Sequence, residues 1–294
     1  MGSRFLLAIL VLKLLGRGYT FLLDGYHRLP LTAHMHSFDF SSAQGWDEFY
    51  KEPQKHDSTT SQEKAETTAT EWHPSVSLEN IASAIPPNGR CLIIGCGNSN
   101  LPDVILKQRD CPLPKSLVLL DTSQTCLDQL RERHLQIEGS SSCDNGTGAK
   151  VSFESTEIEY VCGDVTQLST YFDIPNVDES AEHDVEKHNN VGALFDMIID
   201  KGLTDALLCG EGWDGPLEKL MCESAKILSK ETAGQYLLIS YELPSSTKRF
   251  LVEIGNEVGL KWDFDFDLVT STSQDVDVAM ATIGNPPHHH QSQS

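Results

Sequence analysis

The chain has 294 residues, of which 39% are hydrophobic and 22% charged, which is enough for one α/β domain with a buried core. Its formal net charge of -21 at pH 7 produces a surface field that repels phosphate backbones and attracts basic protein segments or cationic small molecules. We therefore expect no nucleic acid among its direct partners.

The eight cysteines indicate free thiols rather than a metal site. No C-x-x-C pair occurs and no Cys/His spacing matches that of zinc ligands, so the spacing predicts no metal. Several cysteines, such as Cys91 and Cys162, lie in apolar runs, where a free cysteine behaves as a small core side chain.

Residues 1–30 are expected to form a targeting or flexible segment. They contain the basic residues Arg4, Lys13 and Arg17, and no acidic residue occurs before position 24 of this acidic chain. The apolar run 5–15 is too short to span a bilayer, so we expect no stable membrane anchor. The spread of the basic residues favours a mitochondrial presequence, whereas the apolar run is typical of a secretory signal. An uncleaved cytosolic tail is the third alternative.

After a polar connector at 56–71, short β-rich runs alternate with helical runs from residue 77 onward. In chain order they predict a strand at 91–95, a helix from about residue 101, a strand at 116–121, a helix at 123–134, strands at 158–164 and 195–200, a helix at 216–230 and a strand at 235–241. Because strands and helices alternate, the pattern favours a mostly parallel sheet with right-handed crossovers.

The last elements depart from this alternation. A helix around 248–257 is followed by strand-like runs at 261–269 and 277–284, with no room for a helix between them. Such a pair forms a hairpin, so we expect the sheet to end antiparallel. The predicted fold class is therefore α/β: a Rossmann-like, seven-stranded, mostly parallel sheet with an antiparallel terminal hairpin and helices on both faces.

Three polar segments are expected to lie outside the packed fold. The insertions at 139–150 and 176–190 are predicted to be solvated loops because both are polar and the second is acidic. Residues 285–294 are expected to form a disordered tail.

A glycine turn follows the first strand and precedes a helix. Glycine at positions 95 and 97 lets the backbone turn tightly and approach a ligand without a Cβ in the way. Asp121 closes the next strand, where its carboxylate can accept both ribose hydroxyls of a nucleoside. A dinucleotide enzyme would have a third glycine at position 100, where this chain has Asn100. The pattern therefore disfavours NAD and FAD and favours a nucleoside cofactor without a pyrophosphate.

Two further strands end on carboxylates. Asp164 could accept a hydrogen bond from the exocyclic amine of an adenine while the amide of Val165 donates to the ring, and a turn or cap aspartate is the alternative. Asp200 closes the fourth strand, beside the expected nucleoside cofactor. For the adjacent Lys201 a structural ion pair with a nearby carboxylate is the alternative to a role in binding.

Several of these segments resemble one family. The resemblance is to the lysine-methyltransferase branch of the eukaryotic class I, seven-β-strand methyltransferases, which modify translation elongation factor and citrate synthase, and it rests on GCGNSNLP, LLDTS, YVCGDV and above all FDMIIDKGLTDALL. The run GWDEFY at 45–50 resembles the aromatic motif that folds over the cofactor in this branch. The resemblance covers residues 45–284 and implies a methyltransferase domain with S-adenosyl-L-methionine as cofactor and a lysine of another protein as substrate.

The resemblance also implies which residues contact the cofactor. They are Trp46, Tyr50, Gly95, Cys96, Gly97, Asn98, Ser99, Asp121, Thr122, Ser123, Asp164, Val165, Asp200 and Lys201. Two departures concern the substrate side. The branch reads DKGTLDAL where this chain has DKGLTDAL, so Leu203 and Thr204 are exchanged, and Glu242 follows Tyr241 where the branch has a Gln-Pro pair.

Methyl transfer from a sulfonium is an in-line displacement, so the protein mainly aligns nucleophile and methyl group. We expect Asp200 to orient the amine, with Asp205 and Glu242 on the rim. Tyr241 would offer the amine an aromatic face or a hydroxyl, and ordinary strand-end packing is the alternative. Two other functions are open: a small-molecule methyltransferase on the same fold and a catalytically silent cofactor-binding scaffold.

Overall fold

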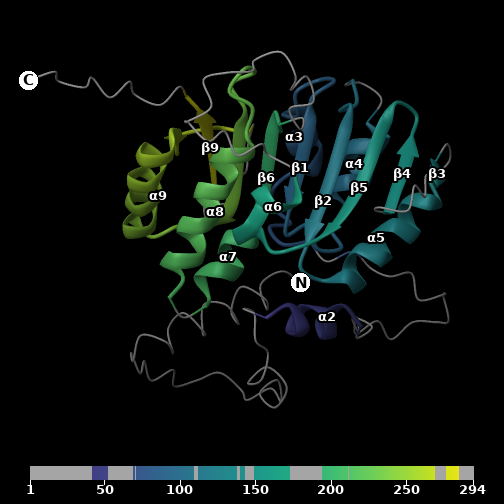
Figure 1. Ribbon diagram of the computed structural model, residues 1–294, viewed down its shortest axis with the longest axis horizontal. Coiled ribbons are helices and arrows are strands. Elements are labelled where there is room, and N and C mark those ends of the chain that lie inside the picture. Colours follow the sequence, from purple (N-terminus) through teal and green to yellow (C-terminus); the bar gives the residue numbers. More distant parts are fainter. Residues whose placement is uncertain are drawn as a thin grey trace, which may run out of the picture.

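The computed structural model describes most of the chain, in segments: 42–51, 69, 71–108, 112–137, 140–142, 149–172, 194–210, 212–268 and 276–284. Helices cover both faces of one nine-stranded sheet, as Figure 1 shows. The predicted Rossmann-like α/β class is confirmed. The expectations for residues 1–30, 176–190 and 285–294 lie outside the described residues.

Five parallel strands form the centre of the sheet. In spatial order they are β5 (Thr156–Cys162), β2 (Ser116–Asp121), β1 (Arg90–Ile94), β6 (Met197–Lys201) and β7 (Gln235–Tyr241). The chain moves outward from β1 in one direction through β2 and β5, and then in the other direction through β6 and β7. The order therefore reverses between β1 and β6, and in such sheets ligands bind outside the carboxyl ends of the strands at this point.

The central strands are apolar on both faces because helices cover both. In β1, the residues from Cys91 to Ile94 are at most 3% exposed. Cys91 and Ile93 face one core and Leu92 and Ile94 the other, as the two-residue period of a strand requires. The first core packs under α3 (Leu78–Ser83), α4 (Leu101–Lys107) and α5 (Gln124–Leu135), and the second under α6 (Leu168–Tyr171), α8 (Asp214–Ile227) and α9 (Ser245–Val258).

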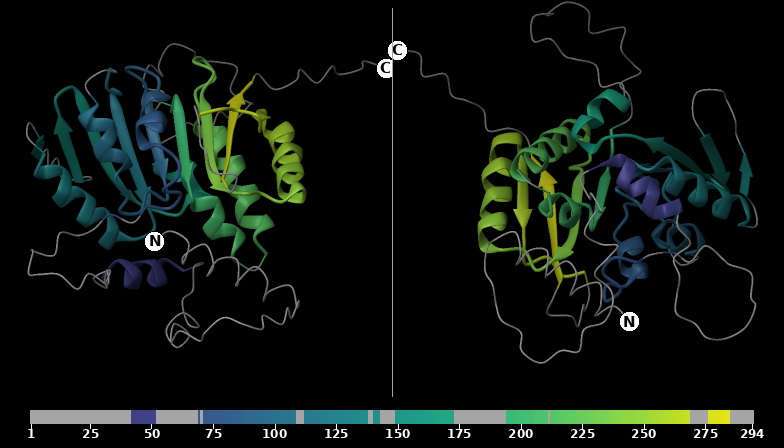
Figure 2. Two further views of the ribbon diagram at one scale, coloured as in Figure 1. Left: turned by 180° about the vertical axis from the view of Figure 1, so that it is seen from behind. Right: turned by 90° about the horizontal axis from the view of Figure 1, so that it is seen from below.

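The sheet ends antiparallel, as predicted. β9 (Val276–Ile283) lies between β7 and β8 (Leu260–Asp263) and is antiparallel to both. Gly259, with φ of 86°, caps α9 in the left-handed conformation, so that β8 starts immediately after the helix. Figure 2 shows this end of the sheet opposite the end formed by β3 (Ser140–Ser142) and β4 (Ala149–Phe153).

The prediction of a solvated loop at 139–150 is wrong at both of its ends. β3 (Ser140–Ser142) and β4 (Ala149–Phe153) form a hairpin that extends the sheet beyond β5, so the sheet has nine strands rather than seven. Val151 and Phe153 are buried in the core under α5. Their alternation with polar residues is a strand pattern, but the polar residues before them concealed it.

Three short helical elements at the carboxyl edge were not predicted. They are α2 (Ala43–Lys51), the 3-10 turn η2 (Val165–Gln167) and α7 (Leu203–Leu208). In Figure 1, α2 and α7 lie at the edge where the parallel strands end. Among the described helices, none combines the length and the apolar character needed to cross a bilayer.

Candidate functional site

A cavity of about 610 Å³ opens at the carboxyl edge of the sheet, above the point where the strand order reverses. Its wall comes from α2, Trp72, the turn after β1, the ends of β2, β5 and β6, and the segment from α7 to the start of α8. Eleven of the fourteen residues expected to contact a cofactor line this cavity: Trp46, Tyr50, Gly95, Cys96, Gly97, Ser99, Asp121, Thr122, Asp164, Val165 and Lys201. Asn98, Ser123 and Asp200 do not.

The turn after β1 requires glycine at two positions. Gly95 and Gly97 have φ of 55° and 53°, in the left-handed region that residues with a Cβ avoid. A Cβ on Gly95 would lie 2.9 Å from Cβ of Leu203, and one on Gly97 would lie 2.7 Å from the hydroxyl of Tyr50. Because neither glycine has a Cβ, the side chains of Leu203 and Tyr50 can pack directly against the turn.

Asp121 faces this turn from the end of β2. Its Oδ2 accepts a hydrogen bond from the amide of Gly97 (2.8 Å) and its Oδ1 one from the amide of Ser123 (2.9 Å). Burial raises the pKa of Asp121, and the two amides act in the opposite direction. Each oxygen keeps lone-pair capacity toward the cavity, so the carboxylate can accept from a ligand hydroxyl.

Helix α2 covers the cavity from outside the sheet. Asp47 fastens it, because its Oδ1 accepts from the hydroxyl of Ser123 (2.5 Å) and the amide of Thr125 (3.2 Å) at the start of α5. The hydrogen bond from Ser123 lowers the pKa of Asp47. This anchor brings Trp46 and Tyr50 to the cavity wall. Asp47 was not among the predicted site residues, although it lies within the aromatic motif.

Asp164, which follows the end of β5, lies at the cavity and also has the cap role that was the alternative to adenine binding. It lines the cavity. Its Oδ1 also accepts from the amide (2.8 Å) and the hydroxyl (2.9 Å) of Thr166, so it caps η2. The amide of Asp164 donates to the hydroxyl of Tyr171 (3.0 Å). Val165 is buried and lines the cavity beside it.

Asp200, which was expected beside the methyl donor, is not among the residues that line the cavity. Its side chain is fully buried; Oδ1 accepts from the amides of Leu203 (3.0 Å) and Thr204 (3.2 Å), and Oδ2 from the hydroxyls of Thr204 (2.6 Å) and Tyr236 (2.9 Å). Burial raises its pKa to about 6 despite these donors. Asp200 therefore holds the start of α7.

The exchanged pair in DKGLTDAL has a local explanation. Thr204 directs its hydroxyl inward to Asp200, while Leu203 lines the cavity and packs against Gly95. Gly202 joins the strand to α7 with φ of 92°, a conformation that favours glycine.

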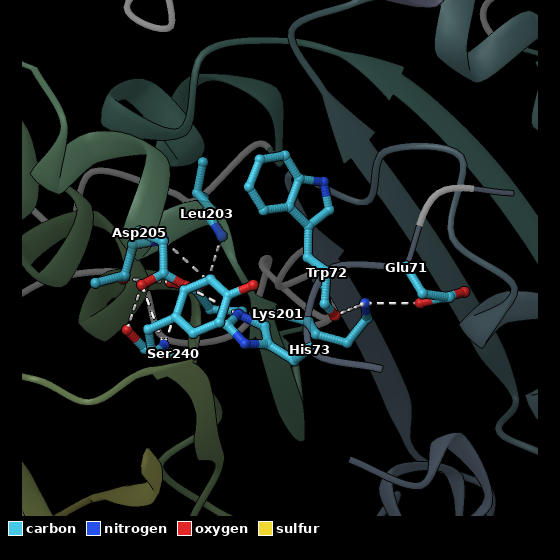
Figure 3. Close-up of polar contacts among 10 residues, drawn as sticks. Glu71, Trp72, His73, Lys201, Leu203, Asp205 and Ser240 are labelled. Carbon is cyan, nitrogen blue, oxygen red and sulfur yellow. Dashed lines mark hydrogen bonds and ion pairs between the residues drawn. The ribbon is translucent and has the colours of Figure 1, made fainter. Parts of the chain in front are cut away.

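A strap formed by Glu71, Trp72 and His73 crosses the carboxyl ends of β1, β6 and β7. Glu71 accepts from the amide of Asn100 (2.5 Å) and the hydroxyl of Ser99 (3.0 Å) beyond β1. Lys201 of β6 pairs with Glu71 (2.9 Å) and donates to the carbonyl of Trp72 (3.0 Å). The structural ion pair considered for Lys201 is thus present. Figure 3 shows the Lys201 contacts on one side of Trp72 and those of Asp205 on the other.

Asp205 is a buried partner of the strap and not a rim residue. Its Oδ2 lies 2.9 Å from Nε2 of His73, and its Oδ1 accepts from the hydroxyl of Ser240 (2.8 Å) and the amide of Tyr241 (3.2 Å) (Figure 3). The rings of His73 and Tyr241 pack with centroids 4.3 Å apart. Tyr241 does not line the cavity, so the packing alternative fits its position. Glu242 is exposed.

Sequence reasoning missed the strap and a second support of the glycine turn. Glu71 is the last residue of the segment 56–71 that was predicted to be a polar connector, and nothing in the spacing of Glu71, Trp72 and His73 points to the strand ends they contact. Arg133 of α5 donates to the carbonyls of Asn98 (3.1 Å) and Ser99 (2.6 Å) and fixes the turn from behind. The sequence gives no indication that an arginine on this helix contacts the backbone of a distant turn.

One curated relative matches the chain. It is the eEF1A lysine and N-terminal methyltransferase of Mus musculus, 24% identical over 208 residues, which are 69% of this chain. The chain spans 22% of the length of that relative. No model of a protein family matches the chain.

Solved structures with a similar arrangement include three bacterial proteins. The YcgJ protein of Bacillus subtilis has a TM-score of 0.44 and 12% identity, with 73% of this chain and 100% of that chain covered. A TehB-like SAM-dependent methyltransferase of Corynebacterium glutamicum has a TM-score of 0.41 and 15% identity, covering 70% and 86%. The magnesium protoporphyrin IX methyltransferase of Synechocystis, with bound SAM, has a TM-score of 0.39 and 11% identity, covering 69% and 74%.

The strand order and the antiparallel end define the class of fold. The chain has a Rossmann-like α/β fold, a mostly parallel sheet that carries its cavity at the carboxyl ends of its strands.

Proposed function

We propose that the chain is an S-adenosylmethionine-dependent methyltransferase that modifies a lysine side chain of another protein. The observation that carries the proposal is the juxtaposition of Asp121 with the turn Gly95–Gly97 in one cavity at the switch point of the sheet. A nucleoside with a methionine arm fits such a cavity, whereas nothing in the turn provides the third glycine of a pyrophosphate site.

The lining residues divide the cavity into two ends. Asp121 would accept from the ribose hydroxyls, and Asp164 with the amide of Val165 would hold the adenine at the β5 end. The methionine arm would then point toward β6, where Lys201 and Gly202 line the wall. Trp46 and Tyr50 would cover the ligand from α2.

The bound cofactor supplies an electrophilic methyl group on a sulfonium. The side chains supply alignment, and Trp72 at the β6 end offers an indole face to an approaching ammonium. Of the described residues lining the cavity, the carboxylates are Asp121 and Asp164, and both would serve the nucleoside. We infer that the amine, with a reference pKa of about 10.4, loses its proton to water as it enters the cavity.

Two observations favour a lysine acceptor. The mouse relative is a lysine and N-terminal methyltransferase, and the match covers 69% of this chain. The net charge of -21 attracts basic protein segments.

We also propose a mitochondrial location, because residues 1–23 contain basic residues and no acidic one. Imaging the full chain with a C-terminal fluorescent fusion tests it, and a secretory or cytosolic signal would contradict it.

Transfer of a radiolabelled methyl group tests the activity. The full chain is incubated with labelled S-adenosylmethionine and fractionated organelle protein, and labelled proteins are then mapped by mass spectrometry. We expect label on a lysine, lost with Asp121→Ala and kept with Asp128→Ala, a solvent-facing carboxylate on α5. Label found in small molecules alone would overturn the lysine assignment. Binding of S-adenosylhomocysteine without any transfer would indicate a silent scaffold.

A further inference from the structure

Two cysteines that lie 30 residues apart in the sequence meet at the floor of the cavity. Cys96 is the middle residue of the glycine turn, and Cys126 lies in the first turn of α5. Their sulfur atoms and a carboxylate oxygen of Asp121 all lie within 4.8 Å of one another. The three side chains are at most 6% exposed. In the part of the chain that the structure describes, no other such group of His, Cys, Asp or Glu side chains occurs.

The three groups form a ligand set for a thiophilic divalent cation. Zinc binds sulfur at about 2.3 Å, so two sulfurs of a tetrahedral site lie about 3.8 Å apart, within the spacing found here. Both thiols lose their protons to solvent as the sulfur–metal bonds form. The charge of a divalent ion would then be more than balanced by two thiolates and one carboxylate.

The position of the cluster connects it to the cofactor. Cys96 and Asp121 line the cavity, so an ion can enter from the cavity and keep its fourth position open toward it. Cys126 lies beneath them and does not line the cavity. An ion held here takes up the lone pairs that Asp121 would otherwise offer to a ribose.

We propose that Cys96, Asp121 and Cys126 form an inhibitory site for a thiophilic divalent cation, at which the ion and the nucleoside of the cofactor exclude each other. The cluster escapes motif searches because its ligands come from three consecutive elements of the fold: the turn after β1, the end of β2 and the start of α5. The exclusion depends on the cofactor part of the proposed function, and the metal binding itself does not.

Cadmium is a suitable probe because its bonds to thiolates absorb in the ultraviolet. The full chain, in a buffer with a phosphine reductant, is titrated with Cd²⁺ alone and then with S-adenosylhomocysteine. We expect saturation at one ion per chain and loss of the absorption as the nucleoside binds. Cys126→Ala should weaken Cd²⁺ binding by roughly tenfold or more while S-adenosylhomocysteine affinity is unchanged.

Cys162→Ala is the matched control, since this cysteine is exposed and lies near the cavity at the end of β5. It should bind Cd²⁺ as the wild type does. Cys126→Ser keeps the size of the side chain and serves if Cys126→Ala melts at a much lower temperature. Unchanged Cd²⁺ binding by both Cys126 variants would overturn the site, and Cd²⁺ absorption that persists under saturating S-adenosylhomocysteine would overturn the exclusion. Neither result depends on whether lysine is the methyl acceptor.

Discussion

The carboxylate of Asp121 fixes the glycine turn and, in the proposed function, also accepts from the ribose of the cofactor. Its oxygens hold the amides of Gly97 and Ser123, and they face the cavity. Hydrogen bonds to a charged acceptor are worth roughly 1.5–3 kcal/mol each, so Asp121→Ala should weaken S-adenosylhomocysteine binding by roughly a hundredfold in calorimetry. Asp121→Asn keeps an acceptor for one amide and should lose less. Affinity within a few-fold of the wild type for both variants would show that the ribose is held elsewhere.

Asp200 predicts a pH dependence of stability. Its pKa is raised from 3.8 to about 6 by burial, so the folded state binds this proton more tightly than the unfolded chain does. The stabilisation is therefore fully present below pH 4 and lost as the pH rises through 6. A shift of this size corresponds to roughly 3 kcal/mol.

Asp200→Asn removes this titration and tests its sign. The difference in unfolding free energy, wild type minus variant, should fall by roughly 2 kcal/mol between pH 4 and pH 7, because other carboxylates titrate equally in both proteins. Urea denaturation at several pH values measures it. A difference that is constant with pH would mean that Asp200 stays ionised throughout.

Among the elements of the fold, the strap of Glu71, Trp72 and His73 was the least expected. Its attachment to β6 depends on the buried ammonium group of Lys201. The side chain of Lys201 is 5% exposed and pairs with Glu71, which is 21% exposed. Glu71→Ala leaves this ammonium unpaired and also removes the acceptor for Ser99 and Asn100. We expect a loss of roughly 3 kcal/mol in unfolding free energy, partly recovered in the double variant with Lys201→Met.

A surface ion pair provides the control for this cycle. Lys150 and Glu157 pair across β4 and β5 with the glutamate about half exposed, so Glu157→Ala should cost less than about 1 kcal/mol. If Glu71→Ala costs no more than Glu157→Ala, the strap does not hold the strand ends together.

Sequence patterns predicted the elements that bury apolar residues on a regular period. The parallel strands, the long helices and the final hairpin were found because their apolar runs are continuous or alternate clearly. The glycine turn and Asp121 were placed correctly because the positive φ angles and the strand end follow from residue type and spacing.

The errors have a common physical cause. Asp200 ends a strand just as Asp121 does, but the strand period turns it toward the face where Tyr236 and Thr204 meet it. Spacing along the chain cannot distinguish these two directions. The strap contacts strands distant in sequence, and only the assembled fold brings Glu71 to Lys201.

For the whole molecule, the net charge of -21 should affect the binding of the protein acceptor more than the binding of the cofactor in the proposed reaction. A basic protein acceptor, as proposed, would approach through a long-range field, which salt screens over a Debye length of about 8 Å at physiological ionic strength. The proposed cofactor would be bound by short contacts inside the cavity, where screening by salt matters less.

Ionic strength should therefore act on the two binding steps differently. As salt rises from about 0.05 to 0.3 M, we expect kcat/KM for the protein acceptor to fall by roughly tenfold, mainly through KM, while the Kd of S-adenosylhomocysteine stays nearly constant. Steady-state methyl transfer and calorimetry in matched buffers measure the two quantities. Equal sensitivity of both would place the effect on the fold or the cavity, and no sensitivity of kcat/KM would mean that the acidic surface has no part in recognising the acceptor.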